Sequence, residues 1–310
     1  MRLMITGGRG FVAGHVVRQL QAGRSADWLA LPSVVDVLDN RALEAEIRRL
    51  APDAVLHLAA QSNVAASFED PAATFRVNYH GTEALLNALD ACGFDGALLF
   101  VGSGDMYGLV DPAAFPITED TPLHPRNPYA VSKVAAEALC FQRAISSRYR
   151  IMMARPFNHV GAGQSTGFAL PSFASQLAAI ARGELAPVLE VGDIDVTRDF
   201  TDVADVAEAY LDLLAHGVRG GIYNICSGRE YRVRDLLDRL IAIAGVTVEV
   251  RQDPARLRPA EQRRVVASHA RLSNATGWQP RTPIEDSLRA IYSSFARFTT
   301  DSGGMHSVSR

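Results

Sequence analysis

The sequence predicts a doubly wound α/β fold on a parallel sheet, with a smaller, interleaved C-terminal lobe. A short apolar strand, Arg2 to Thr6, runs into a glycine-rich turn and then into a helix with apolar residues at helical spacing. Further apolar strands alternate with helical patterns along the chain, which is typical of parallel sheets. The 310 residues can also bury a large core, and folds of this kind often add a second lobe at such a length.

The glycine-rich turn after the first strand predicts a dinucleotide site. Gly7 permits the tight turn, Gly10 lets backbone N–H groups approach a pyrophosphate, and Ala13 is small enough for close helix–strand packing. The helix N-terminus adds positive potential at the phosphates. Glycine turns are common, and the strand before and the helix after this one are what support the interpretation. The residues expected to contact the cofactor here are Gly7, Arg9, Gly10, Phe11 and Val12.

A tyrosine and a lysine four residues apart predict acid–base chemistry. Tyr129 and Lys133 would lie on one face of a helix, one turn apart. A cation held close favours the phenolate and lowers the tyrosine pKa from its usual value near 10, so that a proton can pass near neutral pH. Ser103 would hold the same substrate oxygen, since a hydroxyl can donate and accept. A helix start with an incidental Tyr and Lys is the alternative, which the nucleotide-binding turn upstream disfavours.

These motifs together resemble the extended short-chain dehydrogenase/reductases. The resemblance rests on Thr6-Gly7-x-x-Gly10, His57-Leu58-Ala59-Ala60, Ser103 and Tyr129-x-x-x-Lys133. From Leu3 to about Trp278 the chain is similar to the branch that acts on nucleotide-linked sugars. Within it the chain is most similar to the reductases of GDP-4-keto-6-deoxy-mannose, followed by the GDP-mannose 4,6-dehydratases. The resemblance implies a Rossmann-type domain, a GDP-linked sugar substrate, and a homodimer or dimer of dimers through helices around 74–90 and 130–143.

The resemblance implies NADP(H) or NAD(H) as cofactor and adds further contacts to it. Ala59 and Ala60 would leave space for the dinucleotide beside Leu58, and the backbone at Pro156 would face the nicotinamide. Asp39 would meet the adenine amino group, although a loop Asp capping the next helix is an equal alternative. Tyr129 and Lys133 are cofactor contacts as well, since Lys133 would hold the nicotinamide ribose.

The second strand leaves the choice between NAD and NADP open. Family members usually end that strand with an acidic residue for the ribose or an Arg for a 2′-phosphate. Here the expected strand 28–31 is followed by Pro32 and Ser33, and another strand is expected at 34–37.

The resemblance also implies a set of substrate contacts. Asn158 would bind the diphosphate, with a turn-forming Asn as the alternative. Arg198 and Arg258 would meet phosphate or ribose oxygens, and surface ion pairing is the alternative for the Arg258–Glu261 stretch. The expected substrate residues are Ser62, Ser103, Asn158, Arg198, Arg258 and Glu261. His57 is expected in the core. Asn78 would brace the strand that carries Ser103, unless it is an ordinary exposed Asn.

Asp105 separates the possible reactions. The related dehydratases carry Thr and, two positions later, Glu as the base at C5, whereas this chain has Ser103, Gly104 and Asp105. That pattern resembles the 4-keto-reductases, which need no C5 base. The predicted function is reduction of a nucleotide-linked 4-keto-6-deoxy sugar, with Ser103, Asp105, Tyr129 and Lys133 as the catalytic set. The product would be GDP-D-rhamnose or GDP-6-deoxy-talose. The alternatives are a GDP-mannose 4,6-dehydratase and a non-catalytic NAD(P)-sensing protein of the same fold.

Composition excludes several other classes of function. The net charge of −3 argues against nucleic acid as the main partner, and no apolar run approaches the eighteen or so residues of a membrane span. No signal peptide and no metal site are expected. Three scattered cysteines, Cys92, Cys140 and Cys226, suit reduced thiols and a cytoplasmic protein.

The expected division of the chain is interleaved. Residues 1–160 and part of 195–230 would form the nucleotide-binding domain, residues 161–194 and 231–298 the sugar-nucleotide lobe, and residues 299–310 a disordered tail.

Overall fold

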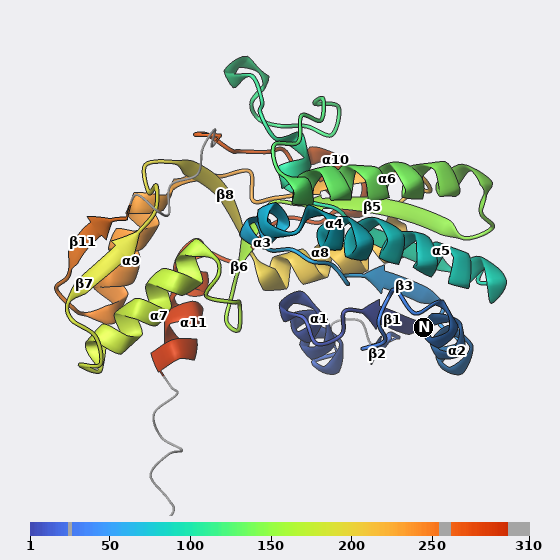
Figure 1. Cartoon of the computed structure of the whole chain (residues 1–310), viewed down its shortest axis with the longest axis horizontal. Helices are drawn as coiled ribbons and strands as arrows, with labels where there is room; N and C mark the ends of the chain where they lie inside the picture. Colours follow the sequence, from blue (N-terminus) through green and yellow to red (C-terminus); the bar gives the residue numbers. More distant parts are fainter. Residues whose placement is uncertain (24–26, 254–261, 297–310) are drawn as a thin grey trace, which may run out of the picture.

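The computed structural model describes residues 1–23, 27–253 and 262–296, and its larger part is built on a six-stranded sheet (Figure 1). Every pairing in this sheet is parallel, in the order β2-β1-β3-β4-β5-β9. Its strands are β1 (Arg2–Thr6), β2 (Leu29–Pro32), β3 (Ala54–His57), β4 (Ala97–Val101), β5 (Arg150–Pro156) and β9 (Ile222–Ile225). The predicted doubly wound α/β fold is therefore confirmed. The expected disordered tail and the residues 258 and 261 lie outside the described residues.

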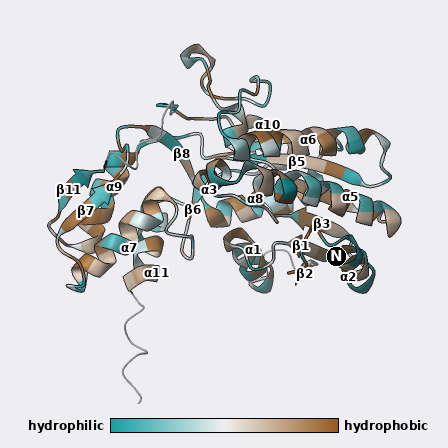
Figure 2. Ribbon diagram, viewed as in Figure 1, coloured by the Kyte–Doolittle hydropathy of each residue, from teal (hydrophilic) through white to brown (hydrophobic). Residues whose placement is uncertain are grey.

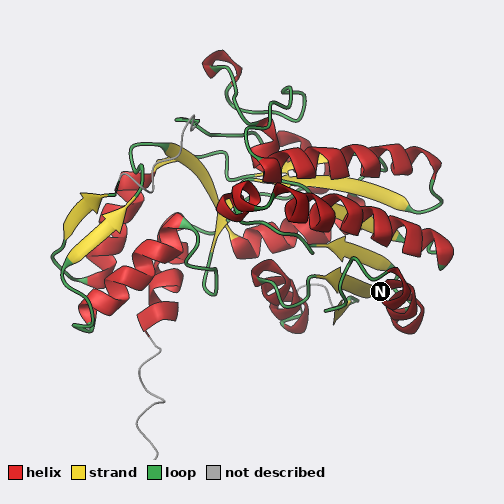
Figure 3. Ribbon diagram, in the orientation of Figure 1, coloured by secondary structure: helices red, strands yellow, loops and turns green. Residues whose placement is uncertain are grey.

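Helices cover both faces of the sheet because successive strand residues point to opposite sides. Leu3 and Ile5 of β1 face one cluster, which buries α1 (Phe11–Gln21) and α8 (Val203–His216). Met4, between them, faces the other cluster, under α2 (Asn40–Leu50), α5 (Gly81–Ala91) and α6 (Pro128–Ser146). Figure 3, in the orientation of Figure 1, shows helices on either side of the strands at the lower end of this sheet, where α1 and α2 flank β1 and β2. The central strands are buried on both faces, as their unbroken apolar runs require.

A second lobe has its own apolar core. Helices α7 (Ala169–Ala181), α9 (Val233–Ala244) and α11 (Ile284–Ala296) pack with the parallel pair β7 (Val188–Val191) and β11 (Glu249–Gln252). Figure 2 shows apolar residues along β7 and on the helices of this lobe. The small sheet of β6 (Asn158–Val160), β8 (Thr197–Asp202) and β10 (Glu230–Arg232) lies between the lobes (Figure 1). None of the helices in the described ranges is long and apolar enough to cross a bilayer.

Two local expectations were wrong. Residues 34–37 are not a strand, because Asp36 turns the chain: its carboxylate accepts from Leu38 N at 3.0 Å, and its carbonyl accepts from Asp39 N at 3.0 Å. The single helix expected over 75–90 is three pieces, namely α4 (Pro71–Phe75), a π-helical turn (Arg76–His80) and α5. The segment after Pro156 forms β6, in which Asn158 pairs in register with Phe200 of β8.

Candidate active site

The glycine turn between β1 and α1 forms a cradle that side chains would fill. Gly7 has φ of +68°, and a Cβ there would lie 2.9 Å from the backbone nitrogen of Ala59. Gly10 is the N-cap of α1, with no side-chain cap on the helix N–H groups. An uncapped, glycine-lined helix N-terminus suits a diphosphate. The residues present therefore fit a dinucleotide.

The loop after β3 lies against this turn. Ala59 N donates to Thr6 Oγ1 at 3.2 Å, and Leu58 packs on the core beside α1. His57 is fully buried between Thr6 and Thr82, and burial lowers its pKa to about 3. His57 is therefore the core histidine that the sequence predicted. The small side chains of Ala59 and Ala60 remain only partly buried at the mouth of the cradle.

Phe11, directly after the glycine turn, packs against β6 of the small sheet between the lobes. Its ring lies parallel to His159 of β6, with centroids 6.2 Å apart, and meets His15 edge-on at 5.0 Å. Val12, the next residue, packs on the core under the sheet. His159 Nδ1 donates to Phe157 O at 3.1 Å, and burial lowers the pKa of His159. His159 is thus placed as a packing partner of Phe11.

The end of β2 carries no carboxylate. Gly8 packs so tightly there that an added Cβ would lie 2.7 Å from Pro32 Cβ, and Ser33 is buried. Arg9, between Gly8 and Gly10, is exposed. Asp39 caps α2 by accepting from Ala42 N at 3.0 Å, as the alternative interpretation predicted.

Helix α6 carries the tyrosine and the lysine in its first two turns. Asn127 caps the helix by accepting from Ala130 N at 2.7 Å, and Pro128 follows at the position where a missing N–H costs nothing. Tyr129 and Lys133 are both buried on the same side of the helix. The predicted helix start and the shared face are confirmed.

The pKa of Tyr129 shifts in the opposite direction to the prediction. Burial raises it, a hydrogen bond with Ser103 lowers it, and the charge of Asp105 raises it again. Lys133 does not offset this, since its ammonium donates to Val101 O at 2.8 Å and lies 5.2 Å from the Phe100 ring centroid. The expected lowering by the lysine was therefore wrong for this state. A raised pKa keeps Tyr129 protonated, as a proton donor must be.

Lys133 is itself poorly solvated. Burial lowers its pKa to about 8. Its bond to Val101 ties α6 to the end of β4, directly before the turn that carries Ser103.

Ser103 and Asp105 belong to one tight turn after β4. Asp105 N donates to Ser103 Oγ at 3.1 Å, at the start of a 3₁₀ turn (Gly104–Tyr107). An added Cβ on Gly104 would lie 2.8 Å from the Phe157 ring, so that only glycine fits between the two catalytic candidates. Ser103, Asp105 and Tyr129 are thereby brought together, as the sequence predicted.

Asn78 has a different role from either one expected. It is buried in the π-helical turn, where Oδ1 accepts from Gln61 N at 2.8 Å and Nδ2 donates to Gln61 O at 3.0 Å. Nδ2 also donates to Ser132 Oγ of α6 at 3.0 Å. Asn78 therefore joins the loop after β3 to the catalytic helix, not to the strand that carries Ser103. The widened π turn is what presents its amide to both.

The expected substrate residues are spread over both lobes. Ser62 is exposed just before α3 (Val64–Glu69), and Asn158 is exposed at the start of β6, two residues after the buried Pro156. Arg198 is buried on β8, where Nη1 donates to Thr197 O at 2.7 Å. Arg258 and Glu261 lie outside the described residues.

The sequence analysis missed several buried polar residues around the site. Glu137 stands one turn beyond Lys133 on the same helical face, and Arg155 follows the apolar run 151–154 of strand β5. The sequence shows both features, namely the four-residue spacing of Lys133 and Glu137 and an arginine directly after an apolar run. Asp199 was also missed: it accepts from Ser227 N, Gly228 N and Ala267 N, and so joins β8 to two distant loops.

Comparisons with known proteins agree with this geometry. The family model described as GDP-mannose 4,6 dehydratase matches residues 33–291. A GDP-6-deoxy-D-mannose reductase from Pseudomonas aeruginosa is 51% identical over 294 residues, which cover 94% of this chain and 96% of that protein. The solved structure of RMD from Pseudomonas aeruginosa complexed with NADPH has a TM-score of 0.90 and 50% identity, over 95% of this chain and 99% of that one.

A more distant likeness extends the comparison to an enzyme with another reaction. The UDP-glucose 4-epimerase from Thermus thermophilus, solved in complex with NAD, has a TM-score of 0.84 and 31% identity, over 96% of this chain and all of that one. The fold, the paired Tyr129 and Lys133, and these matches together show that the chain belongs to the GDP-mannose 4,6-dehydratase family of the extended short-chain dehydrogenase/reductases.

Proposed function

We propose that this protein reduces the 4-keto group of GDP-4-keto-6-deoxy-D-mannose with NADPH. The observation that carries the proposal is the cluster of Ser103, Asp105 and the buried Tyr129, where the turn after β4 meets the start of α6 beside the dinucleotide cradle. The similarity to a GDP-6-deoxy-D-mannose reductase over most of the chain supports it. The product would be GDP-D-rhamnose or GDP-6-deoxy-talose, depending on which sugar face meets the hydride.

Each catalytic side chain has one task in this reaction. Reduced nicotinamide, when bound in the cradle, supplies the hydride that C4 accepts. Ser103 donates a hydrogen bond to the carbonyl oxygen and fixes its position. Tyr129 then gives that oxygen a proton. Lys133 would hold the nicotinamide ribose through its ammonium, which donates to Val101 O in this structure.

NADPH fits the end of β2 better than NADH does. A carboxylate there would bind ribose hydroxyls and repel a 2′-phosphate, and Pro32 and Ser33 supply none. Arg9 is exposed in the glycine turn, directly beside the Gly8–Pro32 contact, where a guanidinium can pair with a phosphate. The solved relative that binds NADPH has the same fold at 50% identity. The adenine contact of Asp39 stays a prediction.

The second lobe would bind the sugar nucleotide. Asn158 and Arg198 lie on the small sheet between the lobes, where a ligand bound above the carboxyl ends of β4 and β5 would reach them. Ser62, Arg258 and Glu261 stay predictions of the same kind, as does the division into 1–160 with part of 195–230, and 161–194 with 231–298.

The number of NADPH molecules consumed for each sugar converted tests the proposal. With GDP-4-keto-6-deoxy-mannose, the protein should consume one NADPH for each sugar converted, and more slowly with NADH. It should leave GDP-mannose untouched. A dehydratase would turn GDP-mannose over without net cofactor consumption, because the hydride taken from C4 returns at C6. Absorbance at the reduced nicotinamide band, with product identification by mass spectrometry, decides between the two.

Asp105→Asn is the matched variant, since it keeps the size and removes the charge. In a reductase the rate should change by less than about tenfold, because hydride delivery depends on Tyr129, Ser103 and positioning. Loss of a general base would lower the rate by roughly two to four decades. GDP-mannose dehydration by the wild-type protein, abolished in Asp105→Asn, would overturn the reductase assignment.

We also propose a homodimer, or a dimer of dimers, through α5 and α6. Helix α6 exposes a stripe of apolar residues at seven-residue spacing, Val131, Ala138 and Ile145, with Phe141 beside it. Two-fold homo-oligomers are the commonest kind. Light scattering at micromolar concentration should give a dimer, and Ala138→Glu should shift it toward monomer. Leu185→Glu, an exposed residue of the second lobe, is the control. A wild-type monomer at all concentrations would contradict this.

We propose a cytoplasmic location from the state of the three cysteines. Cys92, Cys140 and Cys226 are all free, and two of them are buried, which suits a reducing cytoplasm.

A further inference from the structure

A buried ion pair lies behind the two catalytic elements and touches both. Arg155, near the end of β5, forms a forked pair with Glu137 of α6, with Nε–Oε2 at 2.9 Å and Nη2–Oε1 at 2.5 Å. Both side chains are almost completely buried. Burying two charges is costly unless their geometry is good and their remaining donors are satisfied. The pair is therefore weak evidence of a contribution to stability, and its contacts indicate another role.

The same guanidinium reaches the Ser103 turn. Arg155 Nη1 donates to the hydroxyl of Tyr107 at 2.8 Å, and Tyr107 in turn donates to Asn224 Oδ1 at 2.7 Å. Tyr107 is the last residue of the 3₁₀ turn that begins one residue after Ser103. On the other side, the carboxylate of Glu137 lies beside Gly102, the residue before Ser103: a Cβ there would be 3.5 Å from Oε2. The pair thus bonds to the last residue of the turn through Tyr107 and lies close to the residue that precedes Ser103.

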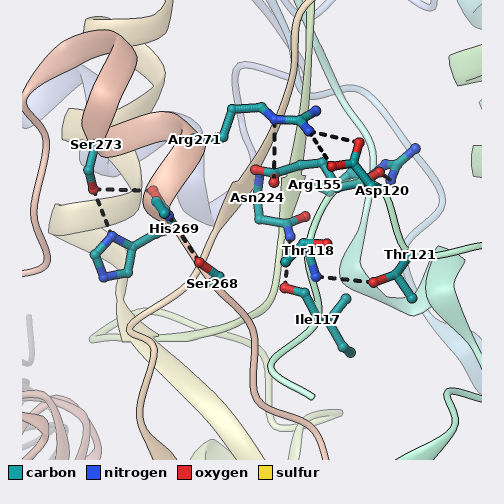
Figure 4. A network of polar contacts seen from close by, with 12 residues as sticks. Ile117, Thr118, Asp120, Thr121, Arg155, Asn224, Ser268, His269, Arg271 and Ser273 are labelled. Atoms are coloured by element: carbon teal, nitrogen blue, oxygen red, sulfur yellow. Dashed lines mark hydrogen bonds and ion pairs between the residues drawn. The ribbon is translucent and has the colours of Figure 1, made fainter. Parts of the chain in front are cut away.

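The network also fixes the helix that carries Tyr129. Glu137 lies eight residues after Tyr129 and four after Lys133, on the same buried side of α6. Its forked bond with Arg155 restrains both the axial position and the rotation of the helix, because two parallel bonds allow little of either. Asn224 of β9 pairs in register with Arg155 of β5. Its backbone N donates to Glu119 Oε1 at 2.8 Å, and its Nδ2 donates to Ile117 O at 3.3 Å. Figure 4 shows Arg155 and Asn224 side by side.

The network continues outward to α10 (Ala270–Thr276). Arg271 binds Asp120 at 2.8 Å and lies 3.6 Å from Glu119, as Figure 4 shows for Arg271 and Asp120. The Ser103 turn, α6 and β9 are therefore linked in one connected network of buried polar contacts.

We propose that Glu137, Arg155 and Tyr107 are positioning residues that set the distance between Ser103 and Tyr129. None of the three is assigned to the acid–base step; they act through the turn and the helix. This inference rests on the proposed function, since it is the reduction that requires Ser103 and Tyr129 to meet one oxygen. A displacement of about 1 Å at such a site can cost as much as a hundredfold in rate.

Tyr107→Phe is the variant that tests this inference. It removes only the hydroxyl and keeps the ring, which stacks on Phe157 with centroids 5.9 Å apart. We expect kcat to fall roughly tenfold to a hundredfold while KM for both substrates stays within twofold. The primary isotope effect, measured with cofactor deuterated at the transferred position, should be at least as large as in the wild type, because hydride transfer then limits the rate.

The matched control is Tyr149→Phe. Tyr149 is equally buried, just before the opposite end of β5, and its hydroxyl bonds to Leu86 O at 3.4 Å. It should lower the melting temperature in a similar way and leave kcat unchanged. Glu137→Gln should lower kcat as well, and the double variant with Tyr107→Phe should lose less than the product of the two single losses.

Two results would overturn the inference. One is kcat within twofold of wild type in Tyr107→Phe; the other is an equal loss of kcat in Tyr149→Phe. Failure of the proposed function would look different, since the wild-type protein itself would not oxidise NADPH with the 4-keto sugar.

Discussion

Tyr129→Phe should lower the rate of reduction by roughly two to four decades, the range that general acid catalysis contributes. The variant removes one hydroxyl and with it the only proton that the buried ring can give. Burial and Asp105 raise the pKa of this hydroxyl, so the wild-type residue is protonated at neutral pH and ready to donate. The measurement is kcat for NADPH oxidation with saturating GDP-4-keto-6-deoxy-mannose.

Cofactor binding separates this effect from unfolding. The glycine cradle lies on β1 and α1, so Tyr129→Phe should bind NADPH with at most a modest loss of affinity, as followed by nicotinamide fluorescence. Tyr149→Phe should keep its turnover. A rate for Tyr129→Phe within threefold of the wild type would remove Tyr129 from the mechanism.

Gly108→Ala should destabilise the protein by about 3 kcal/mol or more, since backbone strain and overpacking each cost about 1–3 kcal/mol. Gly108 ends the turn that carries Ser103 and Asp105, with φ of +60°. A Cβ there would lie 1.7 Å from the carbonyl oxygen of His124, a backbone atom that cannot move away alone. The change in the urea midpoint measures this loss.

Gly245→Ala gives the cost of left-handed backbone strain without a clash, for comparison with Gly108→Ala, at a position whose ψ of −116° lies outside that region. Gly245 caps α9 with φ of +67°, and nothing lies within 4 Å of a Cβ placed on it. Its replacement should therefore cost only the left-handed backbone strain of about 1–2 kcal/mol. Equal losses in the free energy of unfolding for the two variants would show that the turn moves away from His124. The close approach to His124 would then not require a glycine at position 108.

The parallel fold and much of the candidate site could be predicted from the sequence alone. Local patterns carry this information: glycines at Gly7 and Gly10 specify a turn before a helix, and Tyr129 and Lys133 share a face because a helix has a fixed period. Ser103 follows an apolar strand, so its place at the carboxyl edge of the sheet follows from the topology. His57 was correctly expected in the core because all its neighbours on the strand are apolar.

How these residues interact depends on contacts between segments that are far apart in the sequence. The direction of the Tyr129 pKa depends on burial by distant segments, and the ammonium of Lys133 is drawn to Val101 O, which lies 32 positions away in the sequence. Asn78 bonds to Gln61 and Ser132, 17 and 54 positions away. The partners of a buried polar side chain come from wherever the chain brings a donor or acceptor into reach, because an unpaired one is costly. A regular spacing of residues along the chain cannot specify which donor or acceptor becomes the partner.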